Sequence, residues 1–105
     1  MSDRASEVLN DIRGVLVSSA DLLRGHRVVL FGSRAAGTAK DRSDFDIGVD
    51  GDTPLGLSAF YAIADKLESI RTLYRIDWVD LGRTSDMFRS EALKNSRTLY
   101  PFGET

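Results

Sequence analysis

The stretch of sequence that decides the fold is Gly32-Ser33-Arg34-Ala35-Ala36-Gly37-Thr38-Ala39-Lys40-Asp41-Arg42-Ser43-Asp44-Phe45-Asp46-Ile47-Gly48-Val49. It begins with a Gly-Ser turn, and glycine at such a turn lets an anion such as phosphate approach the backbone closely. It ends with two aspartates one residue apart, so on a strand both carboxylates leave the same face and can hold a divalent cation. The stretch therefore predicts a phosphate site beside a metal site.

The residues around these two sites have the patterns of short secondary-structure elements. A β-branched and aromatic run at 27–31 predicts a buried strand that ends at Gly32. Ser33 is expected to begin a short helical turn, whose free N–H groups attract anions. From Phe45 to Val49, apolar residues alternate with Asp44, Asp46 and Gly48, which predicts a strand with one apolar and one functional face.

The rest of the chain predicts three longer helices and one more strand. Apolar spacings of three and four predict a helix over about 2–24. After a turn at Gly51-Asp52, Thr53 is a candidate N-cap with Pro54 at the first helical position. The remaining elements are a helix whose apolar stripe is Leu57, Phe60, Ala64, Leu67 and Ile70, a strand over 75–81, a helix over about 85–94 packed through Met87, Phe88 and Leu93, and an apolar tail over 99–102 that docks on the core.

This order, α-β-(short α)-β-α-β-α, predicts an α/β (α+β) fold with a small mixed sheet and packed helices. A helical crossover between the second and third strands favours a parallel pair. The compact loop between the first and second strands favours antiparallel neighbours. If the second and third strands are parallel, Asp77 lies beside Asp46 on the same face, and three carboxylates converge.

Composition narrows the classes of function. The chain has 105 residues, so we expect one domain over 1–105, with no room for a separate substrate-binding domain. With 14 basic and 16 acidic residues, it is not expected to bind nucleic acid directly. It contains no cysteine and one histidine, which excludes disulfides and multi-histidine zinc sites. The chain lacks an apolar run of roughly 20 residues and has a polar N-terminus, so a cytoplasmic protein without membrane contact is expected.

The aspartates have a plain alternative reading as exposed surface residues, which is the more common context of a bare Asp-x-Asp pair. The upstream Gly32-Ser33 pair makes the pattern specific. Like charges at close range raise carboxylate pKa values, and a bound cation reverses that cost. Asp80 is a second candidate for the third carboxylate, but it lies three residues from Asp77 and so points to the other face of a regular strand. Trp78, next to Asp77, also points to that other face and is expected in the core.

Residues 32–49 resemble the signature of the DNA polymerase β-type nucleotidyltransferase superfamily, Gly-Ser followed by Asp-x-Asp. The chain is most similar to its minimal nucleotidyltransferases, typified by the MntA antitoxins, and the similarity continues through residues 76–81 and 90–100. The resemblance implies that Gly32, Ser33 and Arg34 bind the triphosphate. It also implies that Asp44, Asp46 and Asp77 are catalytic and ligate Mg²⁺. Ala36 stands where many relatives have a basic residue.

For MntA-like proteins the implied partner is a HEPN-domain toxin that is silenced when AMP from ATP, or another nucleoside triphosphate, is transferred to one of its tyrosines. Two alternatives stay open. One is transfer to a small molecule such as an aminoglycoside, and the other is a non-catalytic nucleotide-binding antitoxin that acts by complex formation. Arg34, Lys40 and Arg42 flank the turn and could contact triphosphate or partner, although a solvated loop explains each equally well.

Overall fold

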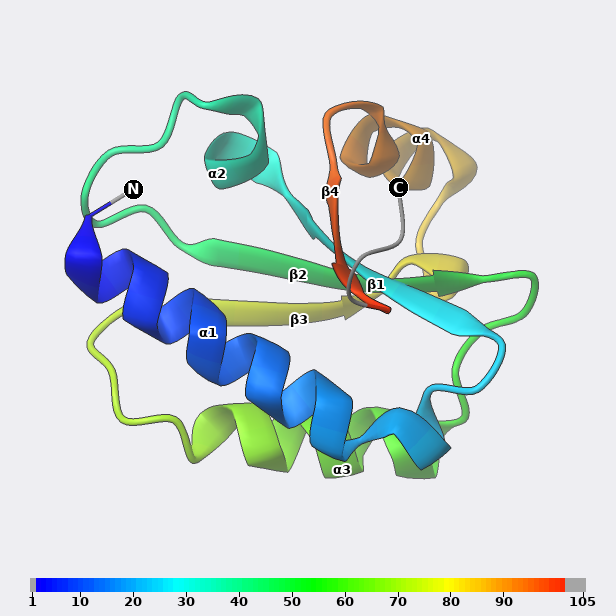
Figure 1. The fold of residues 1–105 in the computed structure, drawn as a ribbon. Helices are drawn as coiled ribbons and strands as arrows, with labels where there is room; N and C mark the ends of the chain where they lie inside the picture. The colour runs from blue at the N-terminus through cyan, green and yellow to red at the C-terminus, as the bar shows by residue number, and fades with distance from the viewer. Residues whose placement is uncertain (1, 102–105) are drawn as a thin grey trace.

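A four-stranded mixed sheet in the order β3-β2-β1-β4 lies between two layers of helices (Figure 1). This computed structural model describes residues 2–101. Helices α1 and α3 cover one face of the sheet, and α2 and α4 lie over the other. The mixed α/β architecture agrees with the prediction. The elements are α1 (Asp3–Ser18), η1 (Ala20–Leu22), β1 (His26–Phe31), α2 (Gly32–Ala36), β2 (Phe45–Gly51), α3 (Leu57–Glu68), β3 (Ile76–Asp80), η2 (Leu81–Arg83), α4 (Asp86–Lys94) and β4 (Arg97–Tyr100).

The register of the sheet aligns the positions expected to carry the chemistry. β1 runs antiparallel to β2, with Phe31 opposite Asp46. β2 runs parallel to β3, with Asp46 opposite Asp77. Both predicted strand directions are confirmed. Because side chains alternate between faces, Asp46 and Asp77 lie next to each other on the same face.

The main core fills the space between the sheet and helices α1 and α3. Phe45 and Ile12 are fully buried there, and each such side chain stabilises the fold by about 1.5–3 kcal/mol. The opposite face has a smaller apolar cluster formed by Val29, Phe31, Leu81 and Ala92. The face that carries Asp46 is thus the less thickly covered of the two, which leaves room for a site. Within residues 2–101, no helix is long and apolar enough to cross a bilayer.

The first helix is shorter than predicted. Ser2 caps it by accepting a hydrogen bond from the Ala5 N–H at 3.2 Å, but α1 ends at Ser18 rather than near residue 24. The Ser19 hydroxyl donates to the Val15 carbonyl at 2.8 Å, and the chain then tightens into the 3-10 turn η1. After this break in the helix, Leu23 enters the core, where it is 1% exposed.

The connection between β2 and α3 corrects the predicted helix start at Thr53 and Pro54. Leu55 lies in a segment without regular secondary structure, where its N–H donates to Asp80 Oδ2 at 2.9 Å and its carbonyl accepts from Arg83 Nη2 at 3.0 Å. These long-range bonds compete with helix formation, so α3 begins only at Leu57, after Gly56. Leu57 was expected on the apolar stripe but is 54% exposed, and Ile63 is fully buried.

Helix α4 begins close to the predicted position. The Ser85 hydroxyl accepts a hydrogen bond from the Phe88 N–H at 3.1 Å and so caps the helix. The expectation that Met87 packs inside is wrong, because it is 80% exposed. Phe88 is 46% exposed, but its ring meets that of Phe31 in β1 edge to face, with centroids 6.1 Å apart, so it does pack on the sheet. Further along α4, Ala92 is buried and Leu93 packs against the smaller cluster.

The apolar tail is a strand rather than an irregular docked segment. β4 pairs antiparallel with β1, with Thr98 opposite Val29. Leu99 is 2% exposed, so its predicted burial is confirmed. A strand of four residues is too short for alternation to be recognised in the sequence, which is why this element was missed. Phe102, the last residue of the predicted tail, lies outside the described residues.

Candidate functional site

The Gly-Ser turn lies directly against Asp46. β1 ends at Phe31, and Gly32 then takes a left-handed conformation with φ +71°. A Cβ atom added to Gly32 would overlap the carboxylate oxygen Oδ2 of Asp46. Only glycine therefore satisfies both the backbone conformation and the close approach. Ser33, in the first turn of α2, is half-buried beside this contact.

The acidic side chains interact strongly enough to shift an ionisation. Asp46 and Asp77 come from neighbouring strands, and Asp44 immediately precedes β2. Burial raises the pKa of Asp46 above its ordinary value of 3.8, and the negative charges of Asp77 and Asp44 raise it further, while Arg75 lowers it. A cation placed among these carboxylates would relieve the repulsion.

The predicted convergence of three carboxylates is met only in part. The face and the register are as expected, but no group of three acidic, histidine or cysteine side chains in residues 2–101 is gathered closely enough to hold a metal ion as it stands. Arg75 explains part of this spacing, because its Nε atom lies 3.0 Å from Asp77 Oδ1. The donor set nevertheless fits a hard divalent cation, since every candidate ligand is a carboxylate oxygen.

The side chain of Arg34, which was expected to contact the triphosphate, is hydrogen-bonded to the protein backbone. Arg34 is 6% exposed, and its guanidinium donates to the carbonyls of Ser43 and Asp41. It also lies over the Phe45 ring, with Cζ 4.2 Å from the ring centroid. These contacts do not support the expectation that Arg34 binds nucleotide, because its donors are directed at the loop that precedes Asp44. Lys40 and Arg42 are exposed on the same loop.

Asp80 has a structural environment rather than a catalytic one. It is 6% exposed and accepts hydrogen bonds from the N–H groups of Leu55 and Gly82, both at 2.9 Å. Arg83 Nε lies 3.4 Å from its Oδ2. Its register partner is Val49, on the face opposite Asp46. Asp77 is therefore the acid of β3 that lies beside Asp46, as the alternation predicted.

Sequence reasoning did not single out Asp50, although it lies two alternating positions beyond Asp46 on the same face of β2. Asp50 is 3% exposed and forms a bidentate pair with Arg89 of α4, with Nε to Oδ1 at 2.7 Å and Nη2 to Oδ2 at 3.2 Å. Arg27 Nη2 lies 3.4 Å from Oδ2. Burial alone would raise the pKa of Asp50, but the hydrogen bonds and charges of Arg89 and Arg27 outweigh it, so the pKa is lowered.

We expect Asp50→Asn to lower the free energy of unfolding by about 1–3 kcal/mol near neutral pH. The contribution of a carboxylate with a lowered folded-state pKa is complete above the unfolded value, here 3.8, and is lost as pH falls through the folded value. The difference between wild type and variant should therefore shrink below about pH 4. Urea unfolding across this range measures it, with Asp21→Asn, a 95% exposed side chain, as the control. A deficit that does not change with pH would contradict this account.

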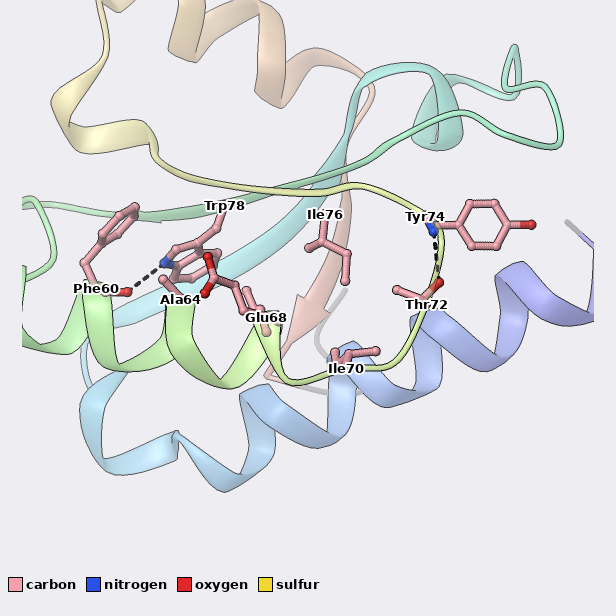
Figure 2. Close-up of a pocket in the computed structure, with 9 residues that line it drawn as sticks. Phe60, Ala64, Glu68, Ile70, Thr72, Tyr74, Ile76 and Trp78 are labelled. Carbon is pink, nitrogen blue, oxygen red and sulfur yellow. Dashed lines mark hydrogen bonds between the residues drawn. The ribbon is translucent and has the colours of Figure 1, made fainter.

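A separate cavity of about 360 Å³ lies on the other face of the sheet, between α3 and β3. Figure 2 shows Phe60, Trp78 and Ile76 around it, with Glu68 at its rim. Trp78 Nε1 donates to the Phe60 carbonyl at 3.0 Å, and the two rings stack with centroids 5.4 Å apart. Trp78 thus packs against the core as predicted. Because Asp77 lies between Ile76 and Trp78 on the strand, its side chain leaves the opposite face, and this cavity is not part of the acidic site.

Comparison with known proteins agrees with this geometry. The family model "Polymerase beta, Nucleotidyltransferase" matches residues 21–103. A curated relative, the probable protein adenylyltransferase MntA of Haemophilus influenzae, is 31% identical over 87 residues, which cover 83% of this chain and 74% of the relative. A chain of a toxin–antitoxin crystal structure with AMP-PNP superposes with a TM-score of 0.63 at 29% identity, covering 88% of this chain and 72% of that one.

A second solved structure shows the fold alone. It is the tri-AMPylated HEPN toxin of Shewanella oneidensis in complex with the MNT antitoxin, matched with a TM-score of 0.58 at 22% identity over 88% of this chain and 71% of that one. The family model, by contrast, covers most of the sequence and includes the Gly-Ser turn and every acid discussed above. This chain therefore belongs to the polymerase beta family of nucleotidyltransferases.

Proposed function

We propose that this protein transfers AMP from ATP to a tyrosine hydroxyl of a HEPN-type toxin, with Mg²⁺ as the metal, and that it thereby acts as an antitoxin. The observation that carries the proposal is the contact between the Gly32 backbone and the Asp46 carboxylate, with Asp77 beside Asp46 on the same face. A phosphate-binding turn and a cation-binding acid in contact with each other are what a metal–triphosphate complex requires. In this proposal residues 1–105 act as one nucleotidyltransferase domain in the cytoplasm.

The turn would hold the triphosphate. Gly32 has no side chain, so the Asp46 carboxylate lies close to the backbone of the turn, and a cation on that carboxylate would lie beside phosphate oxygens held by the turn. The Ser33 hydroxyl supplies a further donor at the same corner. Because Phe31 is opposite Asp46 in the sheet, the two halves of the site are held on adjacent strands and keep their relative position.

Enzymes of this family generally use a divalent metal ion. Asp44, Asp46 and Asp77 would hold it here, and the bound ion would neutralise charge on the phosphate oxygens. In the reaction, the tyrosine oxygen forms a bond to the α-phosphorus while the bond from that phosphorus to the bridging oxygen breaks. Pyrophosphate leaves with the bonding electrons. Asp77, at 33% exposure the accessible acid of β3, accepts the tyrosine proton.

The identity of the acceptor rests on similarity. The curated relative is named a probable protein adenylyltransferase, and the solved structure matched at 29% identity is a toxin–antitoxin complex with AMP-PNP. A protein acceptor also suits a site that lies open on one face of a small sheet, because the partner can supply the surface that surrounds its own hydroxyl.

The deciding experiment mixes the purified protein, Mg²⁺ and a HEPN-domain toxin with ATP labelled either at the α- or at the γ-phosphate. We expect covalent label on the toxin from α-labelled ATP only, with loss of labelling when the accepting tyrosine is replaced by phenylalanine. A stable complex without label would favour inhibition by binding. Label from γ-labelled ATP would indicate phosphorylation and contradict the proposal, and label on an added aminoglycoside instead of the toxin would support the small-molecule alternative.

A further inference from the structure

Arg34 is a buried cation that reaches from the Gly32-Ser33 turn, called the phosphate turn below, to the loop that precedes Asp44 and Asp46. It belongs to α2, immediately after Ser33, and is 6% exposed. Its Nε and Nη2 atoms donate to the Ser43 carbonyl at 3.0 and 2.7 Å, and Nη2 also donates to the Asp41 carbonyl at 3.2 Å. The guanidinium therefore fixes the backbone one residue ahead of Asp44.

The loop that Arg34 holds is itself a closed turn. The Lys40 N–H donates to the Ser43 hydroxyl at 2.8 Å, and the Ser43 N–H donates to the Lys40 carbonyl at 3.0 Å. Arg34 attaches this turn to α2 as a unit. Residues 40–43 are otherwise polar and almost entirely exposed, so the attachment adds to the β1–β2 pairing in relating the position of Asp44 to that of Ser33.

The same guanidinium also packs against two aromatic rings, that of Phe45 at the start of β2 and that of Tyr74 just before β3. Its Cζ atom lies 4.2 Å from the centroid of the Phe45 ring and 5.2 Å from that of Tyr74, and these two rings meet edge to face at 5.5 Å. Phe45 separates Asp44 from Asp46. Tyr74 lies two residues before β3, and the carbonyl of Arg75 between them accepts the Phe45 N–H at 2.9 Å. Arg34 thus contacts the loop before Asp44, the first residue of β2 and the segment that leads into β3.

We propose that Arg34 is a positioning residue that couples the phosphate turn to the metal-binding acids, without touching nucleotide or metal itself. The proposal rests on the nucleotidyl-transfer function given above. It adds a reason why the phosphate turn and the metal-binding acids keep their positions relative to each other. When a metal–nucleotide complex pulls the acids together, the Arg34 contacts transmit that movement to Ser33. Binding of nucleotide and binding of metal then reinforce each other.

Arginine suits this role in a way that lysine does not. The planar guanidinium donates two hydrogen bonds that converge on one carbonyl oxygen and lies over an aromatic ring at the same time. A lysine ammonium keeps the charge but has neither the fork nor the flat face. Arg34→Lys therefore separates the geometric role from the charge, and Arg34→Met removes both.

The test compares wild type, Arg34→Lys, Arg34→Met and the exposed-arginine control Arg24→Met, whose side chain is 84% exposed. Titration calorimetry measures AMP-PNP affinity with and without Mg²⁺, and transfer assays separate kcat from KM. We expect the enhancement of AMP-PNP affinity by Mg²⁺ to fall about tenfold or more in both Arg34 variants, and kcat to fall about 100-fold, as misplacement of reacting groups by about 1 Å can cause. Arg24→Met should behave as wild type.

A second measurement uses the protein without nucleotide or metal. Hydrogen–deuterium exchange over residues 38–46 should accelerate in Arg34→Met and, to a smaller extent, in Tyr74→Leu, which removes one of the two rings that the Arg34 guanidinium contacts. Exchange in α1 should stay unchanged. If Arg34→Met does not fold, Tyr74→Leu gives the same comparison in a milder form.

The outcomes distinguish this inference from the function on which it rests. Wild-type protein that does not bind AMP-PNP contradicts the proposed function and the coupling together. Wild-type protein that binds AMP-PNP with Mg²⁺ dependence, while folded Arg34→Lys keeps the same dependence and the same kcat, overturns the positioning role alone. Unchanged exchange over residues 38–46 in Arg34→Met overturns it as well.

Discussion

Replacement of Asp44 and Asp46 by asparagine is expected to abolish nucleotidyl transfer, with kcat/KM lower by at least about 10³-fold, which corresponds to about 4 kcal/mol of transition-state stabilisation. Asparagine has nearly the same shape as aspartate but lacks the negative charge that a divalent cation requires. Asp46 is the central acid of the site, because its pKa is raised by burial and then by the charges of Asp77 and Asp44. The transfer assay with α-labelled ATP measures the loss, and unchanged transfer would overturn the assignment of the site.

The same double variant should remain folded. In an acid whose folded-state pKa is raised, ionisation costs stability as pH rises through the interval between 3.8 and the folded value. Asparagine removes that cost, so the free energy of unfolding near neutral pH should be equal to or above that of wild type. Urea unfolding tests this, with Asp65→Asn on the exposed side of α3 as the control. Loss of activity together with loss of folding would mean that the acids are structural.

Gly32→Ala is expected to have the second largest effect, on activity and stability together. At φ +71° an alanine is strained by about 1–2 kcal/mol. Its Cβ would also overlap the Asp46 carboxylate, so either the turn or the acid must move. We therefore expect a stability loss greater than the backbone strain alone and a fall in transfer of more than about 100-fold, because the phosphate turn and the acids no longer meet in the same place.

Two other glycines separate these causes. Gly37 has φ +79° but no atom within 4 Å of an added Cβ, so Gly37→Ala should cost only the strain of about 1–2 kcal/mol. Gly14 lies in the interior of α1 with open space around it, so Gly14→Ala should stabilise the protein by about 0.5–1 kcal/mol. Urea unfolding and transfer assays on the series test the order. If Gly32→Ala costs no more than Gly37→Ala, the contact between the turn and Asp46 is not limiting.

Much of the fold could be predicted because its signals are local. The apolar run before Gly32 and the alternation after Asp44 identified β1 and β2, and the helical crossover indicated that β3 runs parallel to β2. From that direction and the period of two, Asp77 follows as the neighbour of Asp46. β4 and the irregular segment around Leu55 were missed, since each is held by a partner far away in sequence, the first by β1 and the second by the buried carboxylate of Asp80.

The roles of the individual charged residues also divide into those that follow from local spacing and those that depend on distant parts of the chain. By its spacing alone the sequence determined which acids share a face and that a glycine-serine turn precedes them, because side-chain direction on a strand depends only on position. Only the tertiary structure decided that Arg34 is buried under the loop before Asp44, that Arg75 holds Asp77, and that Asp50 pairs with Arg89 of α4. An arginine side chain is long and flexible enough to reach several carbonyls or carboxylates, so its partner depends on which groups the folded chain brings within a few ångströms.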